Sequence, residues 1–308
     1  MTNKKDITYI IVTWNSSDEI ITCLDSIKQF SPSNFKVIVV DNCSSDKTAE
    51  LISNVYPEVK VIASEENLGF AKGNNLALEF VDTEYLCYLN PDVILTEDIV
   101  TPSLDKLETD LEIGLVACHL KNPDGSHQAS CFNFANSRSL FTEILHVGAF
   151  LPKGLRKKFF PNHYQAEKPY YPDWVIGAEM IMRTSEAKQI EGFSTEYFMY
   201  TEDMDLCKKI DVILHKKVLY LPHISLIHIG GASEAKNINY NKQKKLFENT
   251  FIFVDKFYSK TESQKTHQNM ILAYQIRLAL LKLLYHKSDR EQQINKTFQS
   301  LQILQEIN

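Results

Sequence analysis

The sequence predicts an α/β fold in which a mostly parallel sheet is flanked by helices and followed by a C-terminal helical extension. Three observations lead to this prediction. Short β-branched runs alternate with helical patterns over the first 120 residues, the connections between them are short, and the chain turns helical beyond about residue 235. Short crossovers of this kind give parallel strands with helices on both faces.

Five segments are expected to be strands because they are short, apolar and rich in β-branched residues. They are Ile7–Val12, Lys36–Val40, Val59–Ala63, Tyr85–Leu89 and Gly114–His119. Four helices are expected between them. The first begins after Ser16 or Ser17, and the second begins after Asp46 and ends before Pro57. The third covers about Ala71–Val81 and the fourth about Asp98–Glu108. Ligands of such sheets bind beyond the C-terminal ends of the strands. Polar residues follow three of these strands: Thr13 and Asn15, Asp41, and Asn90 with Asp92.

The composition is that of an ordinary globular protein, since 44% of the 308 residues are hydrophobic and 23% are charged. The net charge of −6, without a dominant basic stripe before the C-terminal third, argues against a nucleic-acid partner. Six cysteines without CxxC spacing are typical of a reducing compartment and favour a cytoplasmic location. Because no window approaches about 18 uninterrupted apolar residues, we expect neither a signal peptide nor a membrane span.

Two regions allow more than one interpretation. The segment Asn122–Tyr171 is weakly patterned, and its basic and aromatic stretch Pro152–Pro161 is either a contact with an anionic lipid surface or acceptor, or a solvated loop. The apolar helical segment Ile271–Tyr285 either docks as core, pairs with another subunit or lies on a membrane surface.

Three carboxylates, Glu202, Asp203 and Asp205, follow an aromatic and methionine cluster. On a helix that begins near Glu202, Asp203 shares a face with Leu206 and Ile210, so it points toward the interior. Partial desolvation there raises the pKa of the carboxyl group toward the range of a general base. The alternative is a set of caps and helix-dipole partners on a solvated face.

Other residues fit a nucleotide and a cation. Asp41 either accepts a hydrogen bond from a pyrimidine N3–H or forms an Asx turn. The stretch Asn67–Asn75 brings Gly69 and Lys72 to the mouth of a helix, where a diphosphate can approach. The chain lacks GxGxxG and GxxxxGK[ST] motifs, which argues against a Rossmann dehydrogenase or a P-loop nucleotidase.

A single carboxylate, Asp92, follows an apolar strand and a proline, and suits Mg²⁺ or Mn²⁺ if diphosphate oxygens complete the shell. His228 sits in an apolar strand that ends at a glycine pair. Alone it would be a satisfied core histidine, but with Asp92 it becomes a candidate ligand, and an imidazole favours Mn²⁺.

Five motifs in this order resemble glycosyltransferase family 2, and in particular the bacterial rhamnosyltransferase-like enzymes of surface polysaccharide assembly. They are Val39–Asn42, Asn67–Asn75, Leu89–Asp92, Trp174–Ala178 and Tyr200–Leu206. The resemblance covers about residues 7–233. It implies a GT-A fold and inverting transfer of a sugar from a nucleoside-diphosphate donor. It also implies that Asp41 reads the base, Asp92 stands in the metal-binding DxD, Asp203 is the base and His228 joins the metal shell.

The resemblance leads to a division of the chain into a catalytic domain, residues 1–235, and a C-terminal helical region, residues 236–308. The first 120 residues are the expected nucleotide-sugar half, and residues 121–235 are the expected acceptor half. The DxD position departs from the family pattern, because Asn90 replaces its first carboxylate. Activity with weak or no metal dependence therefore stays open.

We expect the donor to contact Thr13, Asn15, Asp41, Asn67, Gly69, Lys72, Asn90 and Asp92. The expected catalytic residues are Asp203 and Glu202, the expected metal ligands are Asp92 and His228, and the expected acceptor contacts are Trp174, Gly177 and Asp205. The donor is a dTDP- or UDP-sugar, rhamnose being one candidate, and the acceptor is a glycan or a lipid-linked oligosaccharide. The expected location is the cytoplasm, with peripheral contact to the inner membrane and homo-oligomers through the C-terminal helices as further options.

Two other functions compete with this one. A sugar nucleotidyltransferase shares the sheet and the metal aspartate, but it needs a glycine-rich N-terminal loop with a basic residue, which Ile11–Asn15 lacks. A catalytically inactive sugar-nucleotide-binding scaffold is favoured by Asn90 and opposed by the intact pair Glu202–Asp203.

Overall fold

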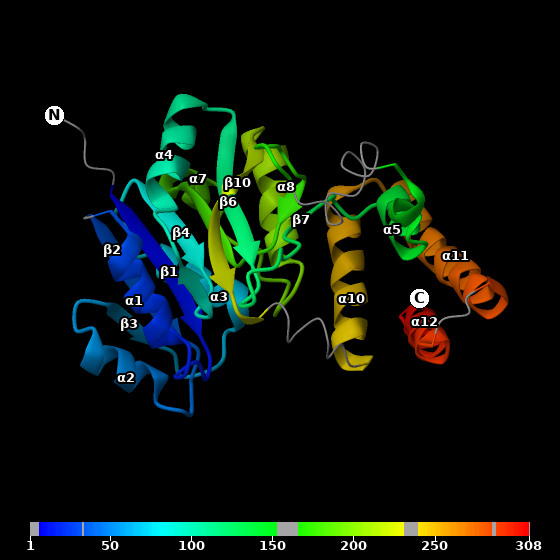
Figure 1. The fold of residues 1–308 in the computed structure, drawn as a ribbon, viewed down its shortest axis with the longest axis horizontal. Helices are drawn as coiled ribbons and strands as arrows, with labels where there is room; N and C mark the ends of the chain where they lie inside the picture. The colour runs from blue at the N-terminus through cyan, green and yellow to red at the C-terminus, as the bar shows by residue number, and fades with distance from the viewer. Residues whose placement is uncertain (1–5, 33, 153–165, 231–239, 285–287, 308) are drawn as a thin grey trace. The chain divides into compact units, whose positions relative to one another are not determined.

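An eight-stranded sheet forms the centre of the first part of the chain in the computed structural model (Figure 1). The structure describes residues 6–32, 34–152, 166–230, 240–284 and 288–307. The strand order is β3-β2-β1-β4-β9-β6-β10-β5. The bounds of these strands are β1 Ile7–Thr13, β2 Phe35–Asp41, β3 Lys60–Ala63, β4 Tyr85–Leu89, β5 Val93–Leu95, β6 Ile113–Lys121, β9 Glu179–Arg183 and β10 Lys217–His228.

Most of the sheet is parallel, as the sequence predicts. β1 pairs in parallel with both β2 and β4, β2 with β3, and β6 with β10. Two antiparallel strands were not expected: β9 lies between β4 and β6, and β5 pairs with the end of β10. A separate two-stranded sheet joins β7 (Cys131–Phe132) to β8 (Trp174–Val175). The result is an α/β arrangement around a mixed, mostly parallel sheet.

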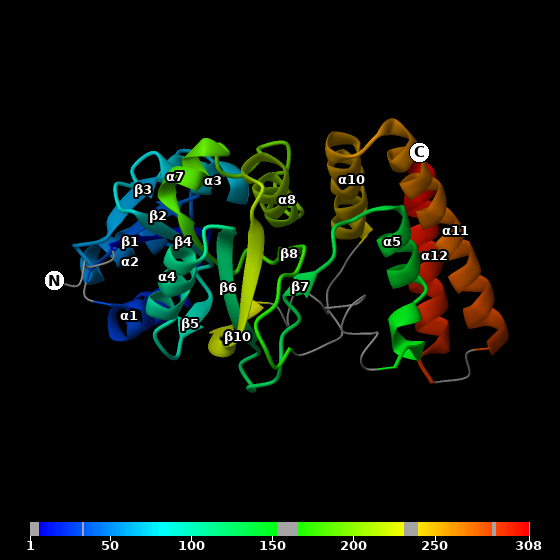
Figure 2. The same cartoon turned by 90° about the horizontal axis from the view of Figure 1, so that it is seen from above.

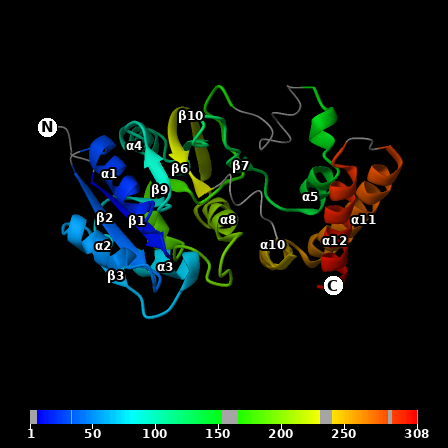
Figure 3. The ribbon, with the colours of Figure 1, turned by 60° about the horizontal axis from the view of Figure 1, so that its bottom comes forward.

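Helices cover both faces of the sheet, as the alternating pattern requires (Figure 3). α1 (Ile20–Phe30) and α4 (Val100–Thr109) bury Leu24, Ile27 and Leu104 in one continuous apolar core. On the other face, α3 (Gly69–Leu78) brings Gly73 against Val12 of β1. The remaining helices of this part are α2 Thr48–Val55, α7 Thr184–Gln189 and α8 Glu202–Leu214.

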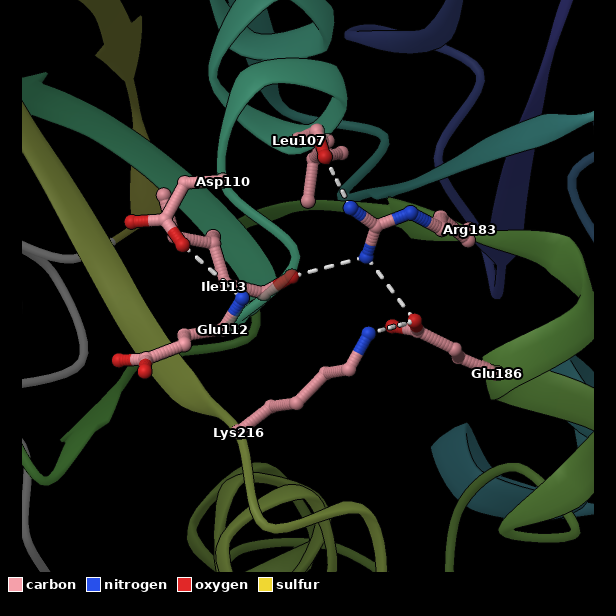
Figure 4. A network of polar contacts seen from close by, with 7 residues as sticks. All are labelled: Leu107, Asp110, Glu112, Ile113, Arg183, Glu186 and Lys216. Carbon is pink, nitrogen blue, oxygen red and sulfur yellow. Dashed lines mark hydrogen bonds and ion pairs between the residues drawn. The ribbon is translucent and has the colours of Figure 1, made fainter.

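A network of polar contacts fastens β9 to its neighbours (Figure 4). The guanidinium group of Arg183 donates to the carbonyls of Leu107 and Ile113 and to Glu186, with distances of 2.8 Å to Ile113 and 2.9 Å to Glu186. Lys216 shares the same Glu186 oxygen. Because the Arg183 and Glu186 side chains are only 13% and 10% exposed, removing one partner would leave a buried charge unpaired.

The chain divides into two compact units, residues 1–132 with 165–234 and residues 133–164 with 235–308. The second unit consists of α5 (Ser137–Ile144), the 3₁₀ turn η1 (Val147–Phe150), α10 (Tyr240–Phe257), α11 (Lys260–Leu284) and α12 (Arg290–Glu306), seen best in Figure 2. None of the helices that the structure describes combines the length and hydropathy needed to cross a membrane.

Residues 133–164, which the sequence analysis placed in the acceptor half, group instead with the C-terminal helices. The reason is that α5 packs along α11: Ser137 N–H donates to Glu262 at 3.0 Å, and Arg277 donates to the carbonyl of Ile144 at 2.8 Å. These partners are more than 120 residues apart, so local patterning gives no sign of them. The basic stretch Pro152–Pro161 lies outside the described residues from Lys153 onward.

Candidate active site

The polar residues that follow β1, β2 and β4 gather at one edge of the sheet. The register pairs Thr13 with Asp41 and Ile11 with Leu89, and Asn90 comes directly after β4. Because the three strands are parallel and adjacent, their C-terminal ends face the same side. The edge therefore presents hydroxyl, amide and carboxylate groups together.

Asp41 is 4% exposed and accepts three hydrogen bonds. The hydroxyl of Thr13 donates at 3.0 Å, and Ser44 donates its backbone N–H at 3.0 Å and its hydroxyl at 2.6 Å. Asp41 can therefore form an Asx-type turn and still accept one further hydrogen bond, because an ionised carboxylate has about four lone-pair sites. Asn15 belongs to the same loop cluster, because its side-chain oxygen accepts from Ser45 N–H at 2.8 Å.

The loop before α3 adopts a conformation that only glycine takes easily. Gly69 has a φ of +77°, and its N–H donates to the side chain of Asn67 at 2.9 Å. Asn42, next to Asp41, donates to the Gly69 carbonyl at 3.0 Å. The loop after β2 and the loop at the start of α3 are thus joined directly. Lys72 is exposed in the first turn of α3.

Asp92 and His228 come together at the end of the antiparallel pair β5 and β10. The distance between Asp92 Oδ1 and His228 Nε2 is 3.4 Å, and Asn90 Nδ2 lies 3.3 Å from the same nitrogen. Burial alone would raise the pKa of Asp92, but hydrogen bonds from His228 and from the backbone of Gly230 outweigh it and hold the pKa below its usual value. The carboxylate is therefore ionised at neutral pH.

Gln128 fixes the orientation of the imidazole ring. Its side-chain oxygen lies 2.7 Å from His228 Nδ1, while its side-chain nitrogen donates to the His228 carbonyl at 3.1 Å and to Asn122 at 2.9 Å. A carbonyl oxygen only accepts, so Nδ1 carries a proton, and Nε2 is the ring nitrogen that faces Asp92, as a donor to that carboxylate or as a lone-pair ligand of a cation. A ring oriented in this way is the usual arrangement of a metal-binding histidine.

These residues fit a divalent cation, but they supply only two protein ligands. No cluster of three or more His, Cys, Asp or Glu that could hold a metal occurs among the described residues. A carboxylate and an imidazole suit Mn²⁺ or Mg²⁺ when ligand oxygens complete the shell. The donor set therefore fits a cation that binds together with a diphosphate.

Asp203 lies in the first turn of α8, on the same side as the fully buried Leu206 and Ile210. Its two oxygens accept hydrogen bonds from Gly177 N–H at 3.1 Å and Met204 N–H at 2.8 Å. Burial raises the pKa of this carboxyl group above its usual range, although both N–H groups work in the opposite direction. Such a group is suited to accept a proton near neutral pH.

Glu202, its neighbour, is 7% exposed, and its Oε2 atom is buried without a hydrogen-bond partner. Burial, and then the charge of Asp203, raise the pKa of Glu202 well above that of an ordinary glutamate. Two adjacent buried carboxyl groups do not both ionise easily. The pair therefore takes up its protons at a higher pH than ordinary carboxyl groups do.

Asp205 has a different environment from the one expected of an acceptor contact. It is completely buried, and its oxygens accept from the Ser194 hydroxyl and from the Tyr197 hydroxyl, the latter at 3.0 Å. These bonds tie α8 to the segment that precedes it. Asp205 therefore positions the helix, and we do not retain it as a residue that touches the acceptor.

Hydrogen bonds to the backbone of two consecutive residues, Gly177 and Ala178, join the two halves of the site. Asp203 accepts from Gly177 N–H, and the next residue, Ala178, accepts from Asn90 N–H at 3.0 Å. Asn90 in turn contacts His228. The carboxylate on α8 and the Asp92–His228 pair are thus connected through two consecutive residues, Gly177 and Ala178.

Aromatic side chains surround this chain of contacts. Trp174 on β8 is half-buried and stacks on Phe132, with ring centroids 4.7 Å apart. A Cβ atom added to Gly177 would meet Phe70 and Asp203 at 3.5 Å, so Gly177 lies between α3 and α8. Trp14 and Phe198 are 58% and 52% exposed next to Thr13 and to Gly69.

Sequence reasoning missed three contributors to this site. Gln128 and Ser44 gave no signal, because a single amide or hydroxyl in a loop has many uses. Phe198 belongs to the recognised aromatic cluster, but its carbonyl approaches Gly69 closely only through tertiary structure. A separate hollow, lined by Lys28, Phe35, Tyr56 and others at the start of β2 and β3, contains none of the predicted site residues.

The sheet edge and the carboxylates gathered there define an α/β protein with a candidate site for a nucleotide and a cation. Residues 8–161, half of the chain, match the family model of glycosyl transferase family 2. The chain therefore belongs to glycosyltransferase family 2.

Individual relatives agree with this assignment. Over 228 residues the chain is 25% identical to the rhamnosyltransferase WbbL of Escherichia coli (strain K12), a match that covers 71% of this chain and 82% of the relative. Over 233 residues it is 24% identical to the N-acetylglucosaminyl-diphospho-decaprenol L-rhamnosyltransferase of Mycobacterium tuberculosis (strain ATCC 25618 / H37Rv), covering 71% and 74%.

The fold is also similar to that of solved structures. The mannosyltransferase PcManGT from Pyrobaculum calidifontis, in complex with GDP-Man and Mn²⁺, matches with a TM-score of 0.61 and 16% identity, over 100% of this chain and 88% of that chain. This similarity shows that the fold is of the GT-A type.

Proposed function

We propose that this glycosyltransferase moves a sugar, rhamnose being the first candidate, from a dTDP- or UDP-linked donor to a hydroxyl group of a glycan or a lipid-linked oligosaccharide. The reaction inverts the anomeric configuration and serves bacterial surface polysaccharide synthesis. The observation that carries the proposal is the chain of contacts from Asp203 through Gly177 and Ala178 to Asn90 and His228.

In this proposal Asp203 is the catalytic base. It removes the proton of the acceptor hydroxyl while that oxygen forms a bond to the anomeric carbon, from the face opposite the departing nucleotide diphosphate. Its raised pKa suits proton transfer from a hydroxyl near neutral pH. Glu202 stays protonated beside it, keeps a second negative charge out of the site and helps to orient the acceptor.

The donor lies along the sheet edge. Asp41, with an acceptor position left, receives the N3–H of uracil or thymine, and Thr13 and Asn15 shape the same loop. The Asn67–Gly69 turn and Lys72 face the diphosphate at the beginning of α3, whose N–H groups favour an anion.

Asp92 and His228 would hold the divalent cation, with Gln128 keeping the His228 lone pair in position. When bound, a divalent cation neutralises negative charge that develops on the leaving diphosphate. Asn90, in place of a carboxylate, leaves the site with one negative charge less than a DxD pair. We therefore expect cation binding that depends on the presence of the nucleotide diphosphate.

The acceptor enters between Gly177 and the aromatic residues, where Trp174 offers a ring for a sugar to stack on. A lipid-linked acceptor is consistent with the similarity to the mycobacterial N-acetylglucosaminyl-diphospho-decaprenol L-rhamnosyltransferase, and it would bring the enzyme to the cytoplasmic face of the membrane. Self-association through the C-terminal helices remains part of the same proposal.

The decisive experiment measures release of nucleotide diphosphate from a panel of nucleotide sugars, with wild type and with the Asp203→Asn variant. An active transferase releases the diphosphate, and the variant loses turnover but still binds the donor by calorimetry. If the wild type binds donors and releases nothing with any donor and acceptor tested, the chain is the sugar-nucleotide-binding scaffold. Release of pyrophosphate from a nucleoside triphosphate and a sugar phosphate would instead identify a nucleotidyltransferase.

A further inference from the structure

Asn75, the last residue of the Asn67–Asn75 motif, has no role in the proposed function. It lies in α3, and its side chain makes two hydrogen bonds to the backbone of a residue 118 positions away. The amide nitrogen donates to the carbonyl of Phe193 at 2.7 Å, and the amide oxygen accepts from the N–H of Phe193 at 2.8 Å. One side chain thus satisfies both backbone groups of Phe193 and fixes its distance from α3.

Gly192, the residue before Phe193, fits closely against this contact. Its φ is +58°, and a Cβ atom added there would overlap the side-chain oxygen of Asn75. The carbonyl of Gly192 accepts from the buried Lys209 of α8 at 2.6 Å. Gly192 and Phe193 are therefore held from two sides, by α3 through Asn75 and by α8 through Lys209.

We call residues 192–201 the bridging segment, because further contacts tie it to both helices. Two of its hydroxyl groups donate to Asp205 of α8. Further along, the carbonyl of Phe198 accepts from the N–H of Phe70, at the beginning of α3, at 3.4 Å. The bridging segment thus contacts α8 and the beginning of α3 after it has left Asn75.

The ring of Phe193 holds the bridging segment from the inside. It is 1% exposed and makes edge-to-face contacts with Phe70 of α3 and Tyr88 of β4, with ring centroids 5.3 and 4.7 Å apart. A close-packed ring cannot move without displacing its neighbours. The position of Phe193 is therefore set by α3 and β4, the two elements that lead to the expected diphosphate and cation sites.

The bridging segment ends directly before the carboxylates of α8. Tyr200 and Thr201 both have positive φ values, +73° and +80°. For a β-branched residue such as Thr201 this conformation is strained and persists only where the surroundings hold it. Glu202 and Asp203 follow at once, so the place of the Asp203 carboxylate depends on the path of the bridging segment.

We propose that Asn75 is a positioning residue of the transferase, which sets the place of Asp203 relative to the beginning of α3 through Phe193 and the bridging segment. The inference rests on the proposed function, in which the diphosphate lies at the beginning of α3 and Asp203 takes the proton of the acceptor hydroxyl. Both groups act at one anomeric carbon. A displacement of about 1 Å between such groups can cost about 10²-fold in rate.

A purely structural role for Asn75 would give a different result. Loss of its two hydrogen bonds would then lower the free energy of unfolding, and the folded protein would keep its kcat. A role in the donor site would raise KM and weaken UDP binding at an unchanged kcat. A positioning role lowers kcat and leaves UDP binding intact, because UDP does not need Asp203.

The test compares Asn75→Ala with the wild type in the full chain. We measure kcat and KM by release of nucleotide diphosphate from the panel of dTDP- and UDP-sugars, UDP binding by calorimetry, and the folded fraction by chemical denaturation. Asn75→Ala should lose about tenfold or more in kcat, while its dissociation constant for UDP stays within about twofold of the wild type. Asn54→Ala, at an exposed position of α2, should match the wild type.

A second variant approaches the same contact from the other side. Gly192→Ala places a methyl group against the Asn75 side chain and should also lower kcat. Gly125→Ala is its matched control, because Gly125 has a φ of +81° and open space around it. If both substitutions act at one contact, the double variant Asn75→Ala, Gly192→Ala should lose no more kcat than the weaker single variant.

Three outcomes would overturn the inference while the wild type is active. They are an unchanged kcat in folded Asn75→Ala, a rise in KM and in the UDP dissociation constant that accounts for the whole effect, and losses that multiply in the double variant. A wild type that releases no nucleotide diphosphate from any sugar of the panel would instead reject the proposed function, and with it the role of Asn75.

Discussion

Gly177 donates its backbone N–H to the carboxylate of Asp203 at 3.1 Å, which fixes the acid of α8 against the loop that follows β8. The same loop holds Asn90 through the Ala178 carbonyl. Backbone groups position the candidate base on one side, and on the other side it is connected to the candidate cation site. It therefore needs no large rearrangement to act. The following expectations depend on this arrangement.

The pH dependence of transfer should reflect the raised pKa of Asp203. A base acts when it is ionised, so kcat/KM should fall as the pH is lowered through that pKa, at a higher pH than for an ordinary aspartate. Glu202→Gln should keep this acidic limb and lose less than about tenfold in rate, whereas Asp203→Asn should lose about 10²-fold or more. A profile that stays flat down to the usual pKa of an aspartate would contradict the assignment of the base.

Replacing Gln128 by Leu should weaken cation binding without touching the ligands. The imidazole of His228 would lose the acceptor that holds its Nδ1 proton, and such changes cost about 10- to 100-fold in metal affinity. Titration of Mn²⁺ by electron paramagnetic resonance, in the presence of the nucleotide diphosphate, measures the effect. Gln264→Leu, at an exposed position of α11, is the matched control. Unchanged Mn²⁺ affinity in Gln128→Leu would reject the ligand role of His228.

Asp41 should discriminate between bases. Wild type is expected to bind UDP and dTDP more tightly than CDP, because cytosine has no N3–H to donate. Asp41→Asn should weaken UDP binding by about 1–3 kcal/mol, since an amide replaces the charged acceptor. The preference for UDP over CDP, measured by calorimetry, should narrow at the same time. Equal weakening for all three nucleotides would mean that Asp41 only supports its own loop through Thr13 and Ser44.

Glu179 should make the stability of the first unit depend on pH. Burial raises its pKa to about 8, while its Oε2 accepts from Cys118 N–H at 2.7 Å and its Oε1 is buried without a partner. The folded state thus binds the proton more tightly than the unfolded state, so stability is lost as the pH rises from the ordinary glutamate pKa to about 8.

Glu179→Gln keeps an acceptor for Cys118 and cannot ionise. Between pH 5 and pH 8, the free energy of unfolding of the wild type should fall by on the order of 3 kcal/mol more than that of this variant. Chemical denaturation at both pH values measures the difference. Glu84→Gln, at an exposed position, should follow the wild type. If both variants follow the wild type, the carboxyl group of Glu179 does not titrate in this range.

The parts of the fold that could be predicted are those with local signals. Ile7–Val12 and Tyr85–Leu89 are strands because their own residues are apolar and β-branched, and parallel pairing follows from the helices between them. The antiparallel strand β9 could not be predicted in the same way. Its neighbours β4 and β6 lie far away in the sequence, and Glu179–Arg183 is not among the five strands that the sequence predicts.

The site shows the same limit. Helical spacing places Asp203 on the same face as Leu206 and Ile210, where its side chain is half-buried. It does not distinguish Asp203 from Asp205 as a functional group, since the partners Ser194 and Tyr197 lie outside the helix. Gln128 contacts a residue 100 positions away, and no local pattern indicates such a contact.

Alanine substitutions at Gly69 and Gly125 separate the cost of backbone strain from the cost of steric crowding. Gly69 and Gly125 both have positive φ values, +77° and +81°. A Cβ atom at Gly69 would lie 2.5 Å from the backbone oxygen of Phe198, whereas at Gly125 it would meet nothing within 4 Å. Both alanine variants suffer the left-handed strain, which costs about 1–2 kcal/mol, but only Gly69→Ala must also move the Phe198 backbone.

We therefore expect Gly125→Ala to lower the free energy of unfolding by about 1 kcal/mol and to bind donor normally. Gly69→Ala should lose at least about twice as much stability, and its affinity for the nucleotide diphosphate should fall because the turn that Asn42 and Asn67 hold is displaced. Chemical denaturation and calorimetry measure the two effects. Equal stability losses in the two variants, with donor binding intact in both, would show that this turn does not approach the donor and that the segment after Asn67 serves only the packing of α3.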